Sequence, residues 1–298
     1  MNSGTSYSSI GIARTNGIEI AYETFGRQGD VPVLLIMGLS SQMILWEDAF
    51  CLMLAEKGFH VVRFDNRDVG LSTKLSTMGM PHIQALLMGR LTPVPYTLLD
   101  MAKDSIGLLD ALGVESAHVV GASMGGMIGQ EMAIGYPGRI RSLTSIMSTT
   151  GNPLLPPPSK EALEILFRPI PTAMEPYVDY FRAVWRILSG KCHPIDDATA
   201  IRLGQESFRR GVEPAGNARQ LAAILASGSR KERLASVKSP TLVIHGTEDP
   251  LVPLACGIDT AESISGARLK ILDGMGHFLP KELWKDIIEA IEAHISLN

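Results

Sequence analysis

The sequence Gly121-Ala122-Ser123-Met124-Gly125 constrains the fold of this chain more than any other segment. It follows an apolar run at 117–120 and precedes an apolar stretch rich in small residues at 126–130. A Gly-x-Ser-x-Gly between a strand and a helix predicts a very tight turn, because larger side chains two residues before or after the serine would clash. We expect the Ser123 hydroxyl to be exposed at the end of the strand, in front of the N-terminus of the following helix.

Strand-like and helix-like segments alternate along the first half of the 298-residue chain. Segments 10–15 and 18–24 alternate polar and apolar residues around Asn16-Gly17, which predicts an antiparallel hairpin. The continuous apolar run at 31–37 predicts a strand buried on both faces, and further strands are predicted at 60–65, 117–120 and 141–147. Stretches with helical spacing that end at a glycine predict helices at 46–58 and 100–113, and a further helix is predicted after Ser123.

The pattern changes at Thr149. Pro153 and the prolines at 156–158 exclude a helix interior or a central strand, and the chain from there to about residue 229 is helical in pattern with no strand-like run. The alternation then resumes, with predicted strands at 241–245 and 268–272 and predicted helices at 254–263 and 283–294.

Both halves of the chain are needed to build one parallel sheet, so the helical block is predicted to be an insertion rather than a second independent domain. We therefore predict an α/β fold whose mostly parallel central sheet is flanked by helices. Residues 1–148 and 230–298 are predicted to form the core, and residues 149–229 a helical cap inserted after the sixth strand.

Two loops in the second half of the chain supply the partners that a nucleophilic serine needs. A serine hydroxyl is a poor nucleophile without a base that accepts its proton and an acid that orients the base. The strand at 241–245 is followed by Asp249, and the strand at 268–272 is followed by His277. Because functional groups gather beyond the carboxyl ends of parallel strands, we predict that Ser123, Asp249 and His277 converge as a catalytic triad.

Each of these residues also has a simpler interpretation. A Gly-x-Ser-x-Gly can be an ordinary turn, Asp249-Pro250 can initiate a turn, and His277 can be a surface residue of a glycine-rich loop. The occurrence of all three in the order Ser, Asp, His, each after a predicted strand, favours catalysis. Glu248 is the alternative acid, and Asp249 is preferred because Pro250 stiffens its loop.

A tetrahedral intermediate on the serine would need hydrogen-bond donors for its oxyanion. The predicted donors are the backbone N–H groups of Met124 and of Leu39, where Gly38 lets the backbone turn. Since both donors are main-chain groups, the side chains of Leu39 and Met124 are free to shape a pocket. Three further candidates to line an apolar acyl or alcohol pocket are Met43, Trp185 and Phe278.

Five stretches of the sequence together are similar to the motifs of a known superfamily. They are Met37-Gly38-Leu39, 65–72, the segment around Ser123, 246–250 and 274–277. On these stretches nearly the whole chain resembles the α/β-hydrolase superfamily. Within it, the chain most resembles the esterase branch that includes aclacinomycin methylesterase, on the stretches 67–72 and 185–190 and on Asp196-Asp197.

The resemblance implies the α/β-hydrolase fold, with residues 149–229 as a helical cap over the active site. Two departures limit what it implies. Met37 stands where many relatives carry histidine, which the mechanism tolerates because the oxyanion donor is a backbone group. The cap otherwise diverges, so an anthracycline substrate is not implied.

The expected function is hydrolysis of small to medium carboxylic esters through an acyl-enzyme, by a carboxylesterase that uses no cofactor and no metal. A serine at position 123 argues against the dehalogenases and epoxide hydrolases of this superfamily, which use aspartate there. A lactonase or a carbon–carbon bond hydrolase with the same triad is an alternative, and the latter could use Arg182 or Arg186 as an added polar group. A cofactor-free perhydrolase or haloperoxidase is a third hypothesis. A non-catalytic scaffold is a fourth, which the presence of all three predicted triad residues disfavours.

Composition argues against several other classes of function. The net charge of −4 provides no basic surface for nucleic acid or anionic lipid, and the longest apolar stretches are too short to cross a membrane. Residues 1–9 lack the features of a signal peptide, and the three cysteines lie too far apart for a CxxC or zinc motif. We expect a cytoplasmic protein that binds a small-molecule ester and neither nucleic acid nor membrane; both a monomer and a small homo-oligomer stay open.

Several charged residues outside the predicted triad have structural interpretations. Asp65 and Arg67 are expected to form a turn or an ion pair near the site. Arg209-Arg210 and Arg230-Lys231 are expected to lie on solvated faces.

Overall fold

The computed structural model describes residues 10–297; residues 1–9, where no signal peptide is expected, and residue 298 lie outside this range. An eight-stranded sheet with the order β1-β2-β4-β3-β5-β6-β7-β8 forms its centre. The strands are β1 (Gly11–Thr15), β2 (Ile18–Phe25), β3 (Val31–Ile36), β4 (Phe59–Phe64), β5 (Ala117–Ala122), β6 (Ile140–Ile146), β7 (Thr241–Gly246) and β8 (Arg268–Leu272). The predicted mostly parallel sheet is confirmed. The pairs β4–β3, β3–β5, β5–β6, β6–β7 and β7–β8 are parallel, whereas the pairs β1–β2 and β2–β4 are antiparallel.

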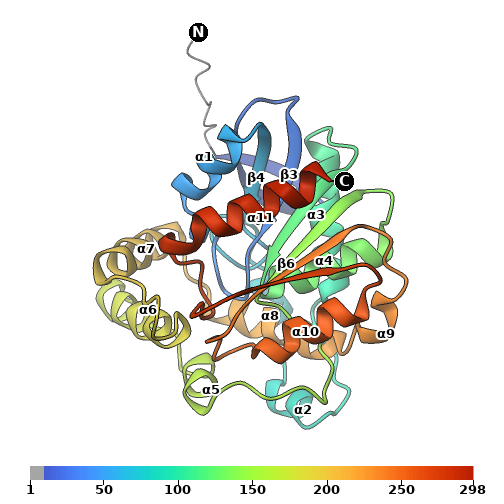
Figure 1. The fold of residues 1–298 in the computed structure, drawn as a ribbon. Coiled ribbons are helices and arrows are strands. Elements are labelled where there is room, and N and C mark those ends of the chain that lie inside the picture. The colour runs from blue at the N-terminus through green and yellow to red at the C-terminus, as the bar shows by residue number, and fades with distance from the viewer. Residues whose placement is uncertain (1–9, 298) are drawn as a thin grey trace.

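Side chains that alternate along the central strands give the sheet two apolar faces. Along β3, Val33 and Leu35 pack into one core, while Leu34 and Ile36 pack into the core on the opposite face. A strand between two such layers needs apolar residues at successive positions, which explains its continuous apolar sequence. One face is covered by α1 (Asp48–Glu56) and α11 (Trp284–Ser296), and the other by α3 (Leu98–Ala111) and α4 (Met124–Gly135), while α10 (Leu254–Ser263) packs against β7 (Figure 1).

The hairpin between β1 and β2 has the geometry that its sequence predicts. Asn16 and Gly17 both have positive φ, 49° and 78°, as the two central residues of a type I′ turn require. Asparagine and glycine tolerate this region better than other residues, so the turn brings Thr15 opposite Ile18 in an antiparallel register.

Five helices separate β6 from β7 in the chain, where the sequence predicts a helical insertion. They are α5 (Lys160–Leu166), α6 (Met174–Leu188), α7 (Asp197–Arg210), α8 (Pro214–Ser227) and the short α9 (Lys231–Leu234), which leads back to β7. Tyr177 and Phe181 of α6 pack against Leu203 of α7. Figure 1 shows α5, α6 and α7 grouped to one side of the sheet rather than on either face. The division of the chain at residues 149 and 229 stays a prediction.

Three short elements are not apparent in the sequence pattern. They are η1 (Met43–Leu45), η2 (Ser76–Met78) and α2 (Ile83–Leu87). Segments of three to five residues are too short to display an apolar period, so hydrophobic spacing cannot identify them. The presence of η1 also explains why the helix predicted to begin at Trp46 begins at Asp48.

Candidate active site

Ser123 lies at the sharp turn between β5 and α4. Its backbone angles, φ 55° and ψ −120°, fall in a region that non-glycine residues rarely adopt. A Cβ on Gly121 would lie 2.2 Å from the carbonyl oxygen of Gly125, and a Cβ on Gly125 would lie 2.1 Å from that of Ile36. Backbone occupies both spaces and cannot yield, so the two glycines of the motif are required by packing.

Neighbouring residues hold the strained backbone of Ser123 in place. Its N–H donates to the carbonyl oxygen of Ile146 at 2.9 Å, and its own carbonyl oxygen accepts a hydrogen bond from Ser148 Oγ at 2.7 Å. Both partners come from the end of β6 and the residues just after it, which lie beside β5 in the sheet. The adjacent strand therefore stabilises the turn that presents the Ser123 hydroxyl.

A chain of two hydrogen bonds joins Ser123, His277 and Asp249. His277 Nε2 lies 2.9 Å from Ser123 Oγ, and His277 Nδ1 lies 2.7 Å from Asp249 Oδ2. The serine follows β5, the aspartate follows β7 and the histidine follows β8, so three loops at the carboxyl ends of parallel strands contribute one residue each. The histidine and the aspartate are buried, with 4% and 7% of their surface exposed, while the serine is half-buried.

The carboxylate of Asp249 is oriented by its own loop. Its Oδ1 accepts hydrogen bonds from the N–H groups of Leu251 at 2.9 Å and Val252 at 2.7 Å, which leaves Oδ2 for His277. A second histidine, His245, lies 3.6 Å from Oδ2 and 2.7 Å from the carbonyl oxygen of Val252. Burial lowers the pKa of His245, so this imidazole is neutral near pH 7.

Glu248 has a different set of partners from Asp249. Its carboxylate accepts hydrogen bonds from the backbone N–H groups of Lys191 at 2.8 Å and Cys192 at 3.1 Å, just after α6. These bonds lower the pKa of Glu248. Glu248 thus connects the β7 loop to the insertion, whereas Asp249 is the carboxylate that contacts His277.

Two backbone N–H groups lie next to Ser123 without a protein acceptor. In residues 10–297, neither the N–H of Leu39 nor that of Met124 donates a hydrogen bond within the protein. Met124 is the first residue of α4, where N–H groups are unpaired and the helix dipole favours negative charge. Gly38 brings the Leu39 loop close, because a Cβ at this position would lie 3.0 Å from Ser123 Cβ.

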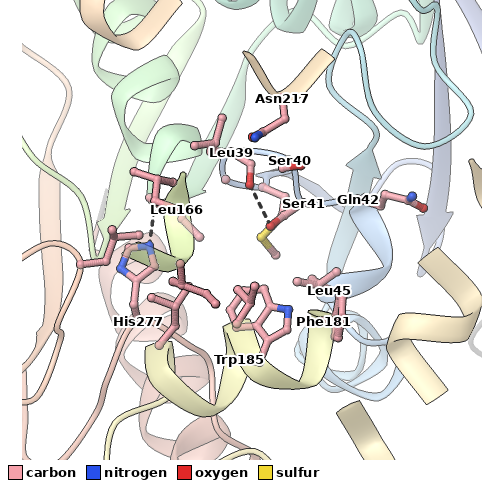
Figure 2. Close-up of a pocket in the computed structure, with 18 of the residues that line it drawn as sticks. Leu39, Ser40, Ser41, Gln42, Leu45, Leu166, Phe181, Trp185, Asn217 and His277 are labelled. Atoms are coloured by element: carbon pink, nitrogen blue, oxygen red, sulfur yellow. Dashed lines mark hydrogen bonds between the residues drawn. The ribbon is translucent and has the colours of Figure 1, made fainter. Parts of the chain in front are cut away.

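A cavity of about 120 Å³ is lined by Ser123 and by His277, which is labelled in Figure 2. Residues 37–42 form one side of it, and α5 and α6 form the opposite wall. The side chains that these two helices contribute are Ala162, Ile165, Leu166, Tyr177, Tyr180, Phe181, Val184, Trp185 and Leu188. No lysine, arginine, aspartate or glutamate is among the described residues that line this cavity.

The structure places the five predicted pocket side chains differently. Leu39 and Trp185 line the cavity (Figure 2). Met43 and Met124 do not, because both side chains are fully buried in the cores on opposite faces of the sheet. Phe278 packs against Trp185 with ring centroids 5.4 Å apart and lines a separate depression. Proximity in sequence to Ser123 or to its predicted partners therefore does not identify the residues that line the pocket.

Apart from Trp185, the side chains of α5 and α6 that line the cavity are not among the predicted pocket residues. Tyr177, Phe181, Trp185 and Leu188 recur at intervals of three or four residues, so they form one face of the helix. This spacing is visible in the sequence and could have identified the wall. What it lacks is any sign that the apolar face meets a cavity rather than the core.

Two of the charged residues expected on solvated faces bond to buried polar groups instead: Arg210 is half-buried and Arg230 is buried. Arg210 pairs with Asp65 at 2.7 Å, and Arg230 donates to Gln130 at 2.9 Å with its side chain fully enclosed. The prediction is therefore wrong for these two arginines, because the core supplies each with a distant polar partner. Arg67 pairs with Asp104 at 2.6 Å, so Asp65 and Arg67 form separate ion pairs.

Arg182 and Arg186 lie outside the cavity. Arg182 pairs with Asp197 at 3.1 Å and Asp179 at 3.3 Å, and Arg186 approaches Asp197 at 3.6 Å. Asp179 and Asp197 are largely exposed, as is Arg186, so these contacts form on the outer surface of the insertion.

Residues 10–297 contain neither a cluster of metal-binding side chains nor a helix that could cross a membrane. No three His, Cys, Asp or Glu side chains in this range are grouped so that they could hold a metal ion. Across the same residues, every helix is too short or too polar to span a bilayer.

Comparison with known proteins agrees with this architecture. Residues 31–282 match the family described as alpha/beta hydrolase fold. The chain is 30% identical to rhodomycin D methylesterase DnrP of Streptomyces peucetius, over 91% of this chain and 93% of that protein. It is also 30% identical to a 2-hydroxymuconate semialdehyde hydrolase of Pseudomonas putida, over 61% of this chain and 63% of that one.

The solved structures include an enol-lactonase from Burkholderia xenovorans with the same fold. It superposes with a TM-score of 0.74 at 21% identity, covering 96% of this chain and 100% of that one. The expected resemblance to methylesterases is confirmed by the Streptomyces relative. By its sequence and its sheet topology, this chain belongs to the alpha/beta hydrolase fold family.

Proposed function

We propose that this protein is a serine hydrolase that cleaves carboxylic esters, with Ser123 as nucleophile, His277 as general base and Asp249 as the acid that orients it. The observation that carries the proposal is the hydrogen-bonded chain from Asp249 through His277 to Ser123, which ends at an uncharged cavity. Similarity to a methylesterase over nearly the full length supports an ester as the substrate.

Acylation follows from the direction of these hydrogen bonds. Asp249 accepts the Nδ1 proton of His277, so Nε2 carries the lone pair that takes the proton of Ser123 Oγ as the oxygen attacks the ester carbonyl. The carboxylate stabilises the imidazolium that forms. The imidazolium then gives its proton to the departing alkoxide, and the acyl group stays on Ser123.

The N–H groups of Leu39 and Met124 are the proposed donors to the tetrahedral oxyanion. Both are unpaired and flank Ser123, as donors to a developing charge must be. In deacylation, His277 removes a proton from water, the hydroxide attacks the acyl carbonyl, and Ser123 Oγ recovers the proton as the acid leaves.

The lining of the cavity supports an uncharged substrate. Aliphatic and aromatic side chains dominate its wall, and a carboxylate placed there would lose its hydration without gaining a cationic partner. We therefore expect esters with neutral, apolar acyl groups to react faster than esters that carry a second carboxylate.

A lactonase is the alternative with the same chemistry, because a lactone is a cyclic ester. A carbon–carbon bond hydrolase has less support from the site, although several relatives are named as hydrolases of 2-hydroxymuconate semialdehyde or of 2-hydroxy-6-oxo-dienoates. The two arginines suggested for that reaction pair with acidic residues on the outer surface and do not line the cavity. No observation favours a perhydrolase.

A panel of p-nitrophenyl esters of graded acyl length, two lactones and a vinylogous diketone tests the proposal. We expect ester turnover in the wild type and loss of nearly all of it in Ser123→Ala and in His277→Ala, because such residues act as a unit. A fluorophosphonate should add to the wild type and leave Ser123→Ala unlabelled, as read by intact mass. Ester turnover that survives Ser123→Ala contradicts the mechanism, and diketone turnover without ester turnover contradicts the substrate class.

A further inference from the structure

The loop that carries Leu39 is attached to the helical insertion by a buried glutamine. Gln220 of α8 is fully buried, and its Oε1 accepts a hydrogen bond from the N–H of Ser40 at 2.8 Å. Its Nε2 donates to the carbonyl oxygen of Arg67 at 2.7 Å. One side chain of the insertion thus holds together two loops of the core that follow different strands, β3 and β4.

The peptide unit between Leu39 and Ser40 is held at both ends. Its N–H belongs to Ser40 and donates to Gln220, and its carbonyl oxygen belongs to Leu39 and accepts from Ser41 Oγ at 3.2 Å. Ser40 has a φ of 60°, which costs free energy for a residue with a side chain and needs such support. The orientation of this peptide unit limits how the preceding N–H, that of Leu39, can point.

The far end of the same loop is attached to the insertion as well. Gln42 Nε2 donates to the carbonyl oxygens of Ser207 at 2.8 Å and Gly211 at 3.0 Å, at the end of α7. Arg210 donates to Gln42 Oε1 at 3.0 Å and pairs with Asp65, which is fully buried in the core. Residues 40 and 42 are therefore both bonded to the insertion, with Leu39 immediately before them.

We propose that Gln220 is a positioning residue for catalysis, which aims the Leu39 N–H at the oxyanion by fixing the Ser40 N–H. This inference rests on the proposed function, because it assigns Leu39 a role in stabilising the tetrahedral intermediate. It makes α8 a part of the machinery that is sensitive to the transition state, although Gln220 itself does not line the cavity.

Gln220→Met tests the proposal, because methionine has a similar length and lacks the acceptor. Gln130→Met is the matched control: Gln130 is also fully buried and also bonds the core to a residue beyond the insertion, Arg230, but has no contact with the Leu39 loop. We expect kcat for a p-nitrophenyl ester to fall about 10- to 100-fold in Gln220→Met with little change in KM. The control should keep a kcat near that of the wild type at a similar loss of thermal stability.

A transition-state analogue separates positioning from general damage. A trifluoromethyl ketone adds Ser123 Oγ to its carbonyl carbon, and the resulting alkoxide occupies the place of the oxyanion. Its inhibition constant should rise in Gln220→Met by the same factor by which kcat/KM falls, while the affinity of the matching ester's acid product stays unchanged. Gln220→Glu keeps an acceptor for the Ser40 N–H and should recover part of the lost kcat.

Ser41→Ala provides a test that does not depend on a buried site. It releases the carbonyl end of the same peptide unit, and we expect a smaller fall in kcat in the same direction. Equal kcat values for Gln220→Met and Gln130→Met, or a rise in KM alone, overturn the positioning role while Ser123→Ala stays inactive. Activity in Ser123→Ala overturns the proposed function itself, so the two failures are distinguishable.

Discussion

Replacing Asp249 by asparagine should inactivate the protein through the tautomer of His277 rather than through lost charge alone. The two N–H groups of Leu251 and Val252 both point at Oδ1, so the amide oxygen of an asparagine must occupy that position. The amide NH₂ then faces His277 Nδ1, where the carboxylate oxygen lies 2.7 Å away in the native protein. A donor at this place requires Nδ1 to accept, which moves the imidazole proton to Nε2.

An imidazole protonated on Nε2 cannot accept the proton of Ser123 Oγ, 2.9 Å away. We expect kcat to fall about 10⁴-fold, or about 5 kcal/mol of transition-state free energy, the size that such a substitution has in other serine hydrolases. Steady-state hydrolysis of p-nitrophenyl acetate measures it, with KM expected to stay within about threefold because Asp249 does not line the cavity.

Glu248→Gln is the matched control for this experiment. It changes the adjacent carboxylate, which holds backbone N–H groups of the insertion and has no contact with His277. We expect its kcat to stay close to the wild-type value. An Asp249→Asn variant within about tenfold of the wild type would refute the tautomer argument, as would an equal loss in Glu248→Gln.

Three further predictions concern stability. Gly121→Ala should lower the free energy of unfolding in urea by about 3 kcal/mol or prevent folding, because its Cβ meets the Gly125 carbonyl, whereas Gly135→Ala, with open space around it, should not. Arg219→Met should cost about 3 to 5 kcal/mol, since it leaves the buried Asp68 without its bidentate partner at 2.8 Å, while Arg14→Met at an exposed pair should cost less than about 0.5 kcal/mol. Burial lowers the pKa of His118 to about 4, so between about pH 6.5 and 4 the unfolded chain binds a proton that the folded chain does not. The free energy of unfolding should therefore fall as the pH falls through this window, and it should fall less in His118→Gln, as measured by urea unfolding at several pH values. The same pH dependence in His118→Gln and in the wild type would contradict this role of His118.

The sheet and the three residues of the proposed triad could be predicted because their sequence signals are local. Gly121 is dictated by a backbone contact with Gly125 in the same turn, and Gly125 by the carbonyl oxygen of Ile36 at the end of β3. Each residue of the proposed triad lies in the loop that follows a strand. The continuous apolar sequence of β3 reports burial on both faces, whatever its neighbours are. Each of these features can therefore be recognised from a single segment of the sequence.

The pocket could not be predicted in the same way, because its walls form between segments far apart in the chain. Met43 and Trp185 are both large apolar residues, yet one packs into a core and the other lines the cavity. In the sequence, nothing distinguishes Arg210 from a solvent-exposed arginine, because its partner Asp65 lies 145 residues earlier in the chain. The packing of the insertion on the sheet determines which apolar helix face lines a cavity and which charged residue has an ion-pair partner.

The backbone of His277 is itself bonded to the insertion, since its N–H donates to the carbonyl oxygen of Leu188 at 2.6 Å, at the last turn of α6. This bond has a consequence for protein engineering. The apolar wall formed by α5 and α6 and the proposed triad come from separate segments of the chain, which invites exchange of the predicted insertion, residues 149–229, for the corresponding segment of another family member. Such a graft must reproduce a carbonyl oxygen for His277 and an acceptor for Ser40, or it will change the rate along with the specificity. A chimera should therefore be selected first on these two contacts and only afterwards on the shape of its pocket.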